Sequence, residues 1–196
     1  MPRKPIIYEY GSGKIELVQG ILQAYPTQVI VCPADDAVSF QEGSVMGNLT
    51  MHSPSVARLL ESYRKKLGKL EKGQVYIETT ELLGPPLVYI FNVVTIYQDE
   101  REGRRVDNFV VSSPKTIRTA TRNCLEVASA LQLESIGFPL LGTGQGHLGL
   151  ETCLRSMIPE ITDKLDRKTS LRTIGIVIQY PRPFRDVRNI LDSRFR

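Results

Sequence analysis

The stretch GFPLLGTGQGHLG, residues 137–149, places glycines at 142, 144, 146 and 149 among hydroxyl, amide and imidazole side chains. The apolar residues 133–138 before it predict a short strand, and residues 150–165 after it have the spacing of an amphipathic helix. Glycines let a backbone turn sharply, and N–H groups near a helix start attract anions. The stretch therefore predicts a phosphate-binding loop, although a tight strand-to-helix turn would by itself also explain the glycines.

Two better-known phosphate loops do not fit this stretch. Its glycine spacing differs from the dinucleotide fingerprint G-x-G-x-x-G, and no Lys-Ser or Lys-Thr pair follows to make a Walker loop.

The composition is that of an ordinary globular protein, with 41% hydrophobic and 23% charged residues among 196. This length suits one domain over residues 1–196. No apolar run approaches the ~20 residues that span a bilayer, and the basic N-terminus leads into no signal-like apolar segment. We therefore expect a cytoplasmic protein that makes no membrane contact.

Cysteine and histidine usage argues against a metal site. The three cysteines, Cys32, Cys124 and Cys153, are scattered over predicted strands and helices, which indicates reduced thiols. There are only two histidines, so a His-rich zinc site is not expected. We expect neither a metal nor a cofactor.

The net charge of +4 suits a phosphate-bearing ligand. Basic residues gather at 64–66, at 101–105 and along the tail from Arg182 to Arg196. No aromatic residues alternate with these charges, as they do in many single-strand binders, so nucleic acid is not the expected partner. An RNA-binding domain that uses the tail and the 101–105 loop stays open as an alternative.

Strand-like and helix-like patterns alternate along the chain, which predicts an α/β fold with a mostly parallel sheet covered on both faces. Strands are expected at 6–10, 14–19, 28–32, 74–79, 87–97 (as a central strand), 133–138 and 171–180. Helices are expected at 54–67, 114–131, 150–165 and 184–191, with Ile117, Ala120, Cys124, Val127, Ala128 and Leu131 on the buried face of the second. We expect Pro33 to end the third strand, residues 98–108 to form an exposed loop, and residues 181–183 to end the last strand before the last helix.

A second small-residue segment follows the β-branched strand at 28–32. It spans residues 33–51 and begins with the adjacent carboxylates Asp35 and Asp36. In open α/β sheets, ligands bind beyond the carboxyl ends of such strands. Two loops of this kind predict one crevice with two walls.

These loops resemble those of the macrodomain family, which binds ADP-ribose and related nucleotides. Three segments carry the resemblance: 15–20 (IELVQG), 29–49 with its paired aspartates, and 138–146 (FPLLGTGQG). The sequence departs from the family where Ile21 replaces an adenine-binding Asp, Asp35 replaces a catalytic-loop Asn, and Glu42-Gly43-Ser44 replaces a triple glycine. Some prokaryotic variants of the family carry the same Asp-Asp pair.

The resemblance implies a three-layer α/β/α fold with a mixed, mostly parallel central sheet, and a diphosphate clasped between two loops. Asp35 would then face the distal ribose, Ile21 would border the base, and Tyr180 or Phe184 would lie against the adenine ring. The implied ligand-binding residues are Gly20, Ile21, Ala34, Asp35, Gly43, Ser44, Val45, Met46, Gly47, Leu141, Gly142, Thr143, Gly144, Gln145, Gly146, His147, Tyr180 and Phe184.

Three functions follow from these patterns. The first is a reader or nucleotide sensor that binds ADP-ribose or a nucleotide derived from it, with an ADP-ribosylated protein as a further partner. The second is an ADP-ribosyl hydrolase in which Asp35 acts as a catalytic base for water. The third is the RNA-binding domain named above. Asp35 and Asp36 could instead only cap the turn after Pro33.

Cys32 and His147 both fall near the expected crevice and could be read as a nucleophile and its base. A lone cysteine that ends a buried strand is more often a small core residue. His147 more simply borders a phosphate or caps the loop.

Overall fold

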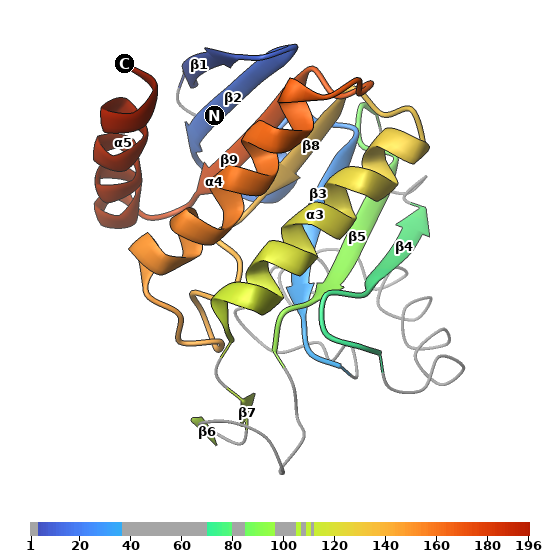
Figure 1. Cartoon of the computed structure of the whole chain (residues 1–196), viewed down its shortest axis with the longest axis vertical. Coiled ribbons are helices and arrows are strands. Elements are labelled where there is room, and N and C mark those ends of the chain that lie inside the picture. The colour runs from blue at the N-terminus through green and yellow to red at the C-terminus, as the bar shows by residue number, and fades with distance from the viewer. Residues whose placement is uncertain (1–3, 37–69, 80–84, 97–104, 107–108, 111) are drawn as a thin grey trace.

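A mixed sheet of seven strands, in the order β1-β2-β9-β8-β3-β5-β4, forms the centre of the computed structural model (Figure 1). The structure describes residues 4–36, 70–79, 85–96, 105–106, 109–110 and 112–196. The strands are β1 Ile6–Tyr10, β2 Gly13–Gln19, β3 Val29–Ala34, β4 Val75–Thr79, β5 Tyr89–Val94, β8 Ser135–Phe138 and β9 Thr173–Ile178. The five inner strands run parallel, and the edge strands β1 and β4 are antiparallel to their neighbours. The predicted α/β fold with a mixed, mostly parallel sheet is confirmed.

Three helices lie on one face of this sheet: α3 Pro114–Ala130, α4 Leu150–Asp166 and α5 Pro181–Phe195. The predicted start of α3 is confirmed, because the Ser113 side chain accepts a hydrogen bond from the Thr116 N–H at 3.1 Å. Most of the predicted buried face of α3 is also confirmed. Leu131 is an exception, since it follows the helix and is 40% exposed.

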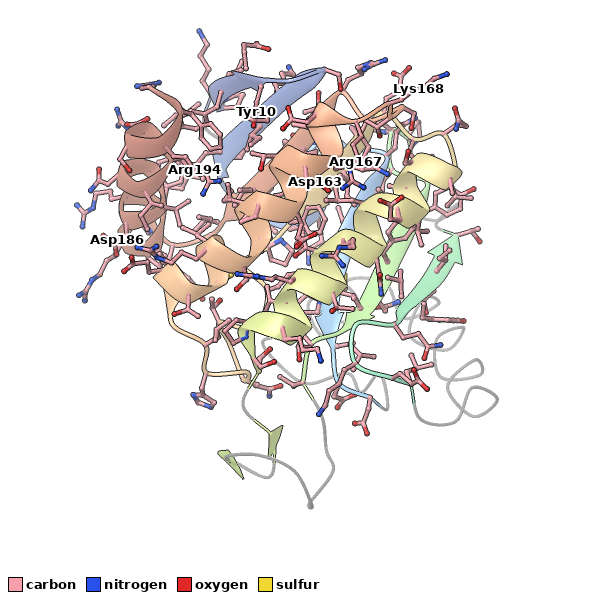
Figure 2. All side chains as sticks on the ribbon, viewed as in Figure 1. Tyr10, Asp163, Arg167, Lys168, Asp186 and Arg194 are labelled. Carbon is pink, nitrogen blue, oxygen red and sulfur yellow. The ribbon has the colours of Figure 1, made fainter. Side chains whose placement is uncertain are left out.

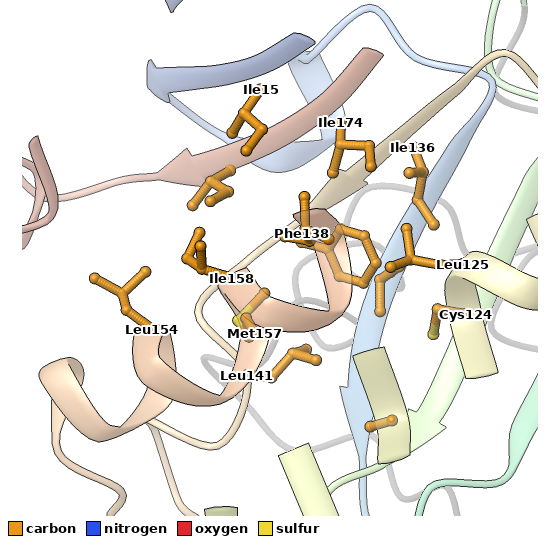
Figure 3. Packing of buried hydrophobic residues seen from close by; sticks show 14 of the residues in the cluster. Ile15, Cys124, Leu125, Ile136, Phe138, Leu141, Leu154, Met157, Ile158 and Ile174 are labelled. Carbon is orange, nitrogen blue, oxygen red and sulfur yellow. The ribbon is translucent and has the colours of Figure 1, made fainter. Parts of the chain in front are cut away.

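The main hydrophobic core fills the space between these helices and the sheet (Figure 3). Phe138 at the end of β8 and Leu141 just beyond it are fully buried there. They lie with Leu125 of α3 and Met157 of α4 in the same cluster. The core therefore anchors the segment that leads from β8 into the glycine-rich stretch.

The opposite face of the sheet carries a second, smaller cluster. Alternate residues of the inner strands point there, including Ile30 and Cys32 of β3. The short 3-10 helix η1, Leu22–Ala24, follows β2 and adds Leu22 to this cluster, with Tyr25 next to it.

Several element boundaries differ from those predicted. Pro33 does not end β3, which continues to Ala34. Beyond Ile30, β3 pairs only with β5, so the N–H that proline lacks is not needed on the β8 side. The strand predicted as central, β5, is shorter than expected and lies second from the sheet edge.

Two further differences concern the loop and the last helix. Within the predicted loop 98–108, Arg105–Val106 forms strand β6, which pairs with β7, Phe109–Val110. The last helix begins at Pro181 rather than at 184, since proline fits the first turn of a helix, where no N–H is needed. The helix predicted at 54–67 lies outside the described residues.

Charged side chains lie on the outer surfaces of the helices (Figure 2). On α4, the Arg167 guanidinium contacts Asp163 at 2.8 Å, one turn away. Among the described helices, none is long and apolar enough to cross a membrane.

Candidate functional site

The carboxyl ends of the parallel strands meet at one edge of the sheet. There, β2 leads to Gly20 and Ile21, β9 leads to Tyr180, β8 leads to the glycine-rich stretch and β3 leads to Asp35. Strand pairing aligns Gln19 with Ile178 at the end of β2 and β9. Four predicted parts of the site are therefore neighbours along this edge, where α/β proteins bind their ligands.

Residues 142–146, which we call the glycine loop, fold back on themselves. The Leu148 N–H donates to the Gly142 carbonyl at 3.0 Å, and the His147 N–H donates to the Gly144 carbonyl at 2.9 Å. Gly142 has a φ of 74°, in the left-handed region that glycine adopts without steric cost. His147 also lies in this region, with a φ of 47°. These bonds give the loop a defined shape before any ligand is present.

Ser112 supports the glycine loop from behind, and the sequence patterns did not indicate it. Its N–H donates to the Gly146 carbonyl at 2.9 Å. A Cβ atom at Gly146 would lie 2.6 Å from the Gly142 carbonyl oxygen and 2.9 Å from the Ser112 Cβ. Gly146 is therefore required by close packing, which a glycine pattern can suggest without naming the neighbour.

The N–H groups of residues 143–146 are the candidate donors for a ligand, although Gly146 itself is buried. No hydrogen bond between described residues uses any of these four donors. Gly144, Gln145 and His147 are exposed. The loop leads into α4, whose N-cap, Gly149, has no side chain to satisfy the first-turn N–H groups. Such successive N–H groups beside a helix start form an anion-binding cradle.

Asp35 is at the predicted strand end, but its side chain is only 3% exposed. The neighbouring Asp36 is also buried, and its carbonyl accepts a hydrogen bond from the Leu70 N–H at 2.9 Å. The Thr95 N–H donates to the Ala34 carbonyl at 2.9 Å. The end of β3 is thus tied to two other segments, and little of the Asp35 side chain is accessible.

Two large apolar side chains stand exposed at the ends of β2 and β9. Ile21 is 55% exposed and Tyr180 is 65% exposed, whereas most large apolar residues are buried. Phe184, the other predicted aromatic contact, is half-buried and packs against the main core. Of these two aromatic rings, the structure presents Tyr180 at the surface.

Cys32 does not have the properties of a nucleophile. It is fully buried, and this burial raises the pKa of its thiol well above the ordinary value, with a further contribution from the nearby Glu78. A thiol that stays protonated is a poor nucleophile. His147 is exposed directly after the glycine loop, so the alternative of a Cys32–His147 pair finds no support.

The remaining predicted site residues divide into three groups. The side chains of Ala34 and Leu141 are buried, so only their backbones could meet a ligand. Thr143 is half-buried, and its hydroxyl donates to the Leu140 carbonyl at 2.9 Å. Gly43, Ser44, Val45, Met46 and Gly47 lie outside the described residues, so the second wall stays a prediction. Within the described ranges, no cluster of three or more His, Cys, Asp or Glu residues could hold a metal.

Comparison with known proteins identifies the family. The Macro domain family profile matches residues 41–157, more than half of the chain. No curated protein sequence matches. Among solved structures, the Oceanobacillus iheyensis macrodomain with ADP has a TM-score of 0.81 at 19% identity, covering 99% of this chain and 97% of the other. A mutant of that macrodomain with ADPR gives a TM-score of 0.81 at 19% identity, covering 97% and 98%.

A macrodomain from a second organism provides a similar match. The Trypanosoma brucei macrodomain in complex with ADP-ribose has a TM-score of 0.72 at 20% identity, covering 90% of this chain and 68% of the other. These matches show the three-layer α/β/α fold expected from the resemblance. Together with the family profile, they establish that this chain belongs to the macrodomain family.

Proposed function

We propose that this protein binds ADP-ribose or a nucleotide derived from it and acts as a reader or sensor. The observation that carries the proposal is the glycine loop, where four successive N–H groups remain without a partner among the described residues. Similar structures have been solved with ADP and with ADP-ribose, which supports this class of ligand.

The order of the strands suggests how the ligand lies. The edge presents Ile21 and Tyr180 first, then the glycine loop, then the end of β3 with Asp35. Neighbouring strands are ~4.8 Å apart, so β2 and β3 are separated by roughly 14 Å. This length accommodates a base, a diphosphate and a second ribose in that order. We therefore place the base against Ile21 and Tyr180, and the distal ribose near Asp35.

Main-chain donors explain how a diphosphate is bound without dedicated side-chain charges. Each N–H group of the loop carries a partial positive charge, and the start of α4 adds the positive end of its helix dipole. The exposed Ile21 and Tyr180 provide apolar surface for either face of a base. A ligand that carries both a diphosphate and a base would use both parts of the edge.

Binding is favoured over hydrolysis by the burial of Asp35. A general base must come within hydrogen-bond distance of the water that it activates, and the carboxylate of a residue that is 3% exposed has little access to water. A comparison of ADP-ribose release from a modified protein by the wild type and by Asp35→Ala checks this point. We expect no release by either protein.

Calorimetric titration with ADP-ribose tests the proposed binding. In Gly144→Val, the new side chain would project from an exposed position where a Cβ atom meets nothing within 4 Å. The fold should therefore be kept while the phosphate position is obstructed, and we expect at least a ~10-fold weaker affinity, or about 1.4 kcal/mol.

The matched control is Ala130→Val, which also adds a branched side chain at an exposed position, here at the end of α3 and outside the proposed site. This variant should bind ADP-ribose with nearly wild-type affinity. Absence of binding heat with ADP-ribose, ADP and related nucleotides would refute the proposed function.

A further inference from the structure

Tyr25 lies flat against two glycines in the middle of the sheet. A Cβ atom at Gly175 of β9 would lie 2.5 Å from Cζ and 2.7 Å from Oη of Tyr25. A Cβ atom at Gly137 of β8 would lie 3.0 Å from the Cδ1 atom of the same ring. The two glycines thus leave a shallow space on neighbouring strands, and the tyrosine ring fills it.

The Tyr25 hydroxyl forms a hydrogen bond at the end of this space. It donates to Glu16 Oε2 at 2.9 Å, and the Lys14 ammonium contacts Glu16 Oε1 at 2.8 Å. Glu16 lies beside Gly175 in the strand pairing and is nearly buried. A buried carboxylate is costly unless it is bonded on both oxygens, so this arrangement favours one position of the ring.

One short turn connects the ring to the edge of the sheet where the carboxyl ends of the parallel strands meet. The Tyr25 N–H donates to the Leu22 carbonyl at 3.1 Å, and the Ala24 N–H donates to the Ile21 carbonyl at 3.0 Å. On the other side of Ile21, the Gly20 N–H donates to the Ile178 carbonyl at 3.0 Å. Backbone hydrogen bonds therefore hold Ile21 on both sides: Gly20 before it is bonded to β9, and the turn after it is bonded up to Tyr25.

This anchoring explains why an isoleucine stands exposed. Leu22 points into the second cluster beside Tyr25, which leaves Ile21 directed away from the sheet. A binding surface that is fixed in advance loses less conformational entropy when the ligand arrives. The same turn therefore keeps Ile21 in place next to the end of β9 and Tyr180.

We propose that Tyr25 is a positioning residue, which fixes Ile21 for contact with the base of the bound nucleotide through its packing on Gly137 and Gly175 and its bond to Glu16. The proposal rests on the proposed function. It also assigns a role to the two strand glycines, which lie outside the glycine loop and contact a residue of the second cluster, on the opposite face of the sheet from the main core.

The test compares ligands with and without a base. In Tyr25→Phe the ring stays and the bond to Glu16 is lost, and in Gly175→Ala the added methyl group displaces the ring. We expect ADP-ribose affinity to fall about 3-fold in the first variant and at least ~10-fold in the second. Ribose 5-phosphate, titrated by NMR because of its weaker binding, should keep its wild-type affinity in both.

A second readout follows the Ile21 side chain itself. Its δ1-methyl resonance should shift when ADP-ribose is added to the wild type, and this shift should shrink in Tyr25→Phe. The control is Tyr8→Phe, which removes a comparable bond of 2.7 Å to Asp192 between β1 and α5. It should leave both affinities unchanged.

The outcomes separate the two proposals. If the wild type binds no nucleotide, the proposed function fails. If it binds ADP-ribose but Tyr25→Phe and Gly175→Ala bind it equally well, or lose both ligands to the same extent, the positioning role is refuted. Should Gly175→Ala not fold, Glu16→Gln replaces it, since this change weakens the bond to Tyr25 while its side chain keeps the same size.

Discussion

Two glycines of the same loop differ in what a side chain would meet. At Gly146 a Cβ atom would clash with the Gly142 carbonyl and with Ser112, whereas at Gly144 it would meet nothing within 4 Å. The loop is thus closely packed at Gly146 and open at Gly144, two residues earlier. Gly146 therefore shapes the loop, and Gly144 leaves room above it.

We predict that Gly146→Ala lowers the free energy of unfolding by about 1–3 kcal/mol, the usual cost of an overpacked position. Gly144→Ala should change it by less than about 0.5 kcal/mol, as at other open surface sites. Urea denaturation of the two variants measures the difference. Equal losses would mean that the loop does not pack on Ser112 as described.

Glu78 in β4 is a second residue whose properties depend on its environment, here through the pKa of its carboxyl group. It is nearly buried, and burial raises the pKa of its carboxyl to about 7, although the Asn92 amide opposes the rise. Its Oε2 atom and both polar side-chain atoms of Asn92 are buried, and within the described residues none of them makes a hydrogen bond of standard geometry, so the amide acts on the carboxyl only as a nearby dipole. A carboxyl group in this setting is more easily kept neutral than charged.

The sign of the pH effect follows from this raised pKa. The folded protein binds the Glu78 proton more tightly than the unfolded chain, whose carboxyl has the ordinary pKa of 4.5. The stabilising contribution is therefore complete below about pH 4.5 and is lost as the pH rises through about 7. Glu78→Gln stays neutral and should be more stable than the wild type at about pH 8, by up to about 3 kcal/mol.

Denaturation of the wild type and Glu78→Gln at about pH 4 and about pH 8 checks this prediction. At the lower pH the two proteins should differ little, because both side chains are then neutral. A constant difference at both pH values would contradict the raised pKa.

At the scale of elements, the start of α3 connects helix stability to the glycine loop. Ser113 caps the helix, and the preceding Ser112 holds the Gly146 carbonyl. The first turn of α3 and the shape of the loop are thus fixed by adjacent residues. Loss of the cap should therefore also change the conformation of the glycine loop.

We predict that Ser113→Ala lowers the free energy of unfolding by about 1 kcal/mol, as loss of an N-cap usually does. Ser113→Asp, which can still accept the Thr116 N–H, should stay close to the wild type. Thermal denaturation measures both, and ADP-ribose titration shows whether the alanine variant also binds more weakly. Equal stability of the two variants would show that the cap contributes nothing.

Element boundaries show where pattern reading succeeds. The Ser113–Pro114 pair predicted the start of α3 correctly, because a cap and a first-turn proline act locally. The proline at 181 lies beyond the end of the last strand, as the sequence predicts, but it also begins α5, three residues before the predicted helix start at 184. Proline excludes only an N–H donor, so whether it ends a strand or starts a helix depends on the neighbouring chain.

At the scale of the whole molecule, the main core joins elements from both ends of the chain. Tyr8 of β1 and Leu191 of α5 belong to the same cluster as Phe138. We therefore propose that residues 1–196 form one domain. It should unfold in a single transition when followed by far-ultraviolet circular dichroism and by tyrosine fluorescence.

A ligand that binds only the folded protein should shift this transition as a whole. At an ADP-ribose concentration about 100-fold above its dissociation constant, we expect a stabilisation of about 2.7 kcal/mol. Differential scanning calorimetry with and without ligand measures it. Two separate transitions, only one of them shifted by the ligand, would contradict the single domain.

The sequence by itself determined the features that depend on neighbouring residues. The apolar strands, the cap of α3, and the glycine loop between β8 and α4 all follow from local periodicity and from backbone freedom at glycine. The resemblance carried by those segments led to the correct family, which the family profile confirms.

Only the tertiary structure decided which residues meet across the sheet. β2 pairs with β9, its partner from the far end of the chain, and this places Ile21 beside the strand that ends at Tyr180. It also brings Gly175 under Tyr25. Asp35 is buried at the end of β3, where backbone hydrogen bonds join Ala34 to Thr95 and Asp36 to Leu70. Such contacts depend on strand order and on packing between distant segments, and no local pattern contains that information.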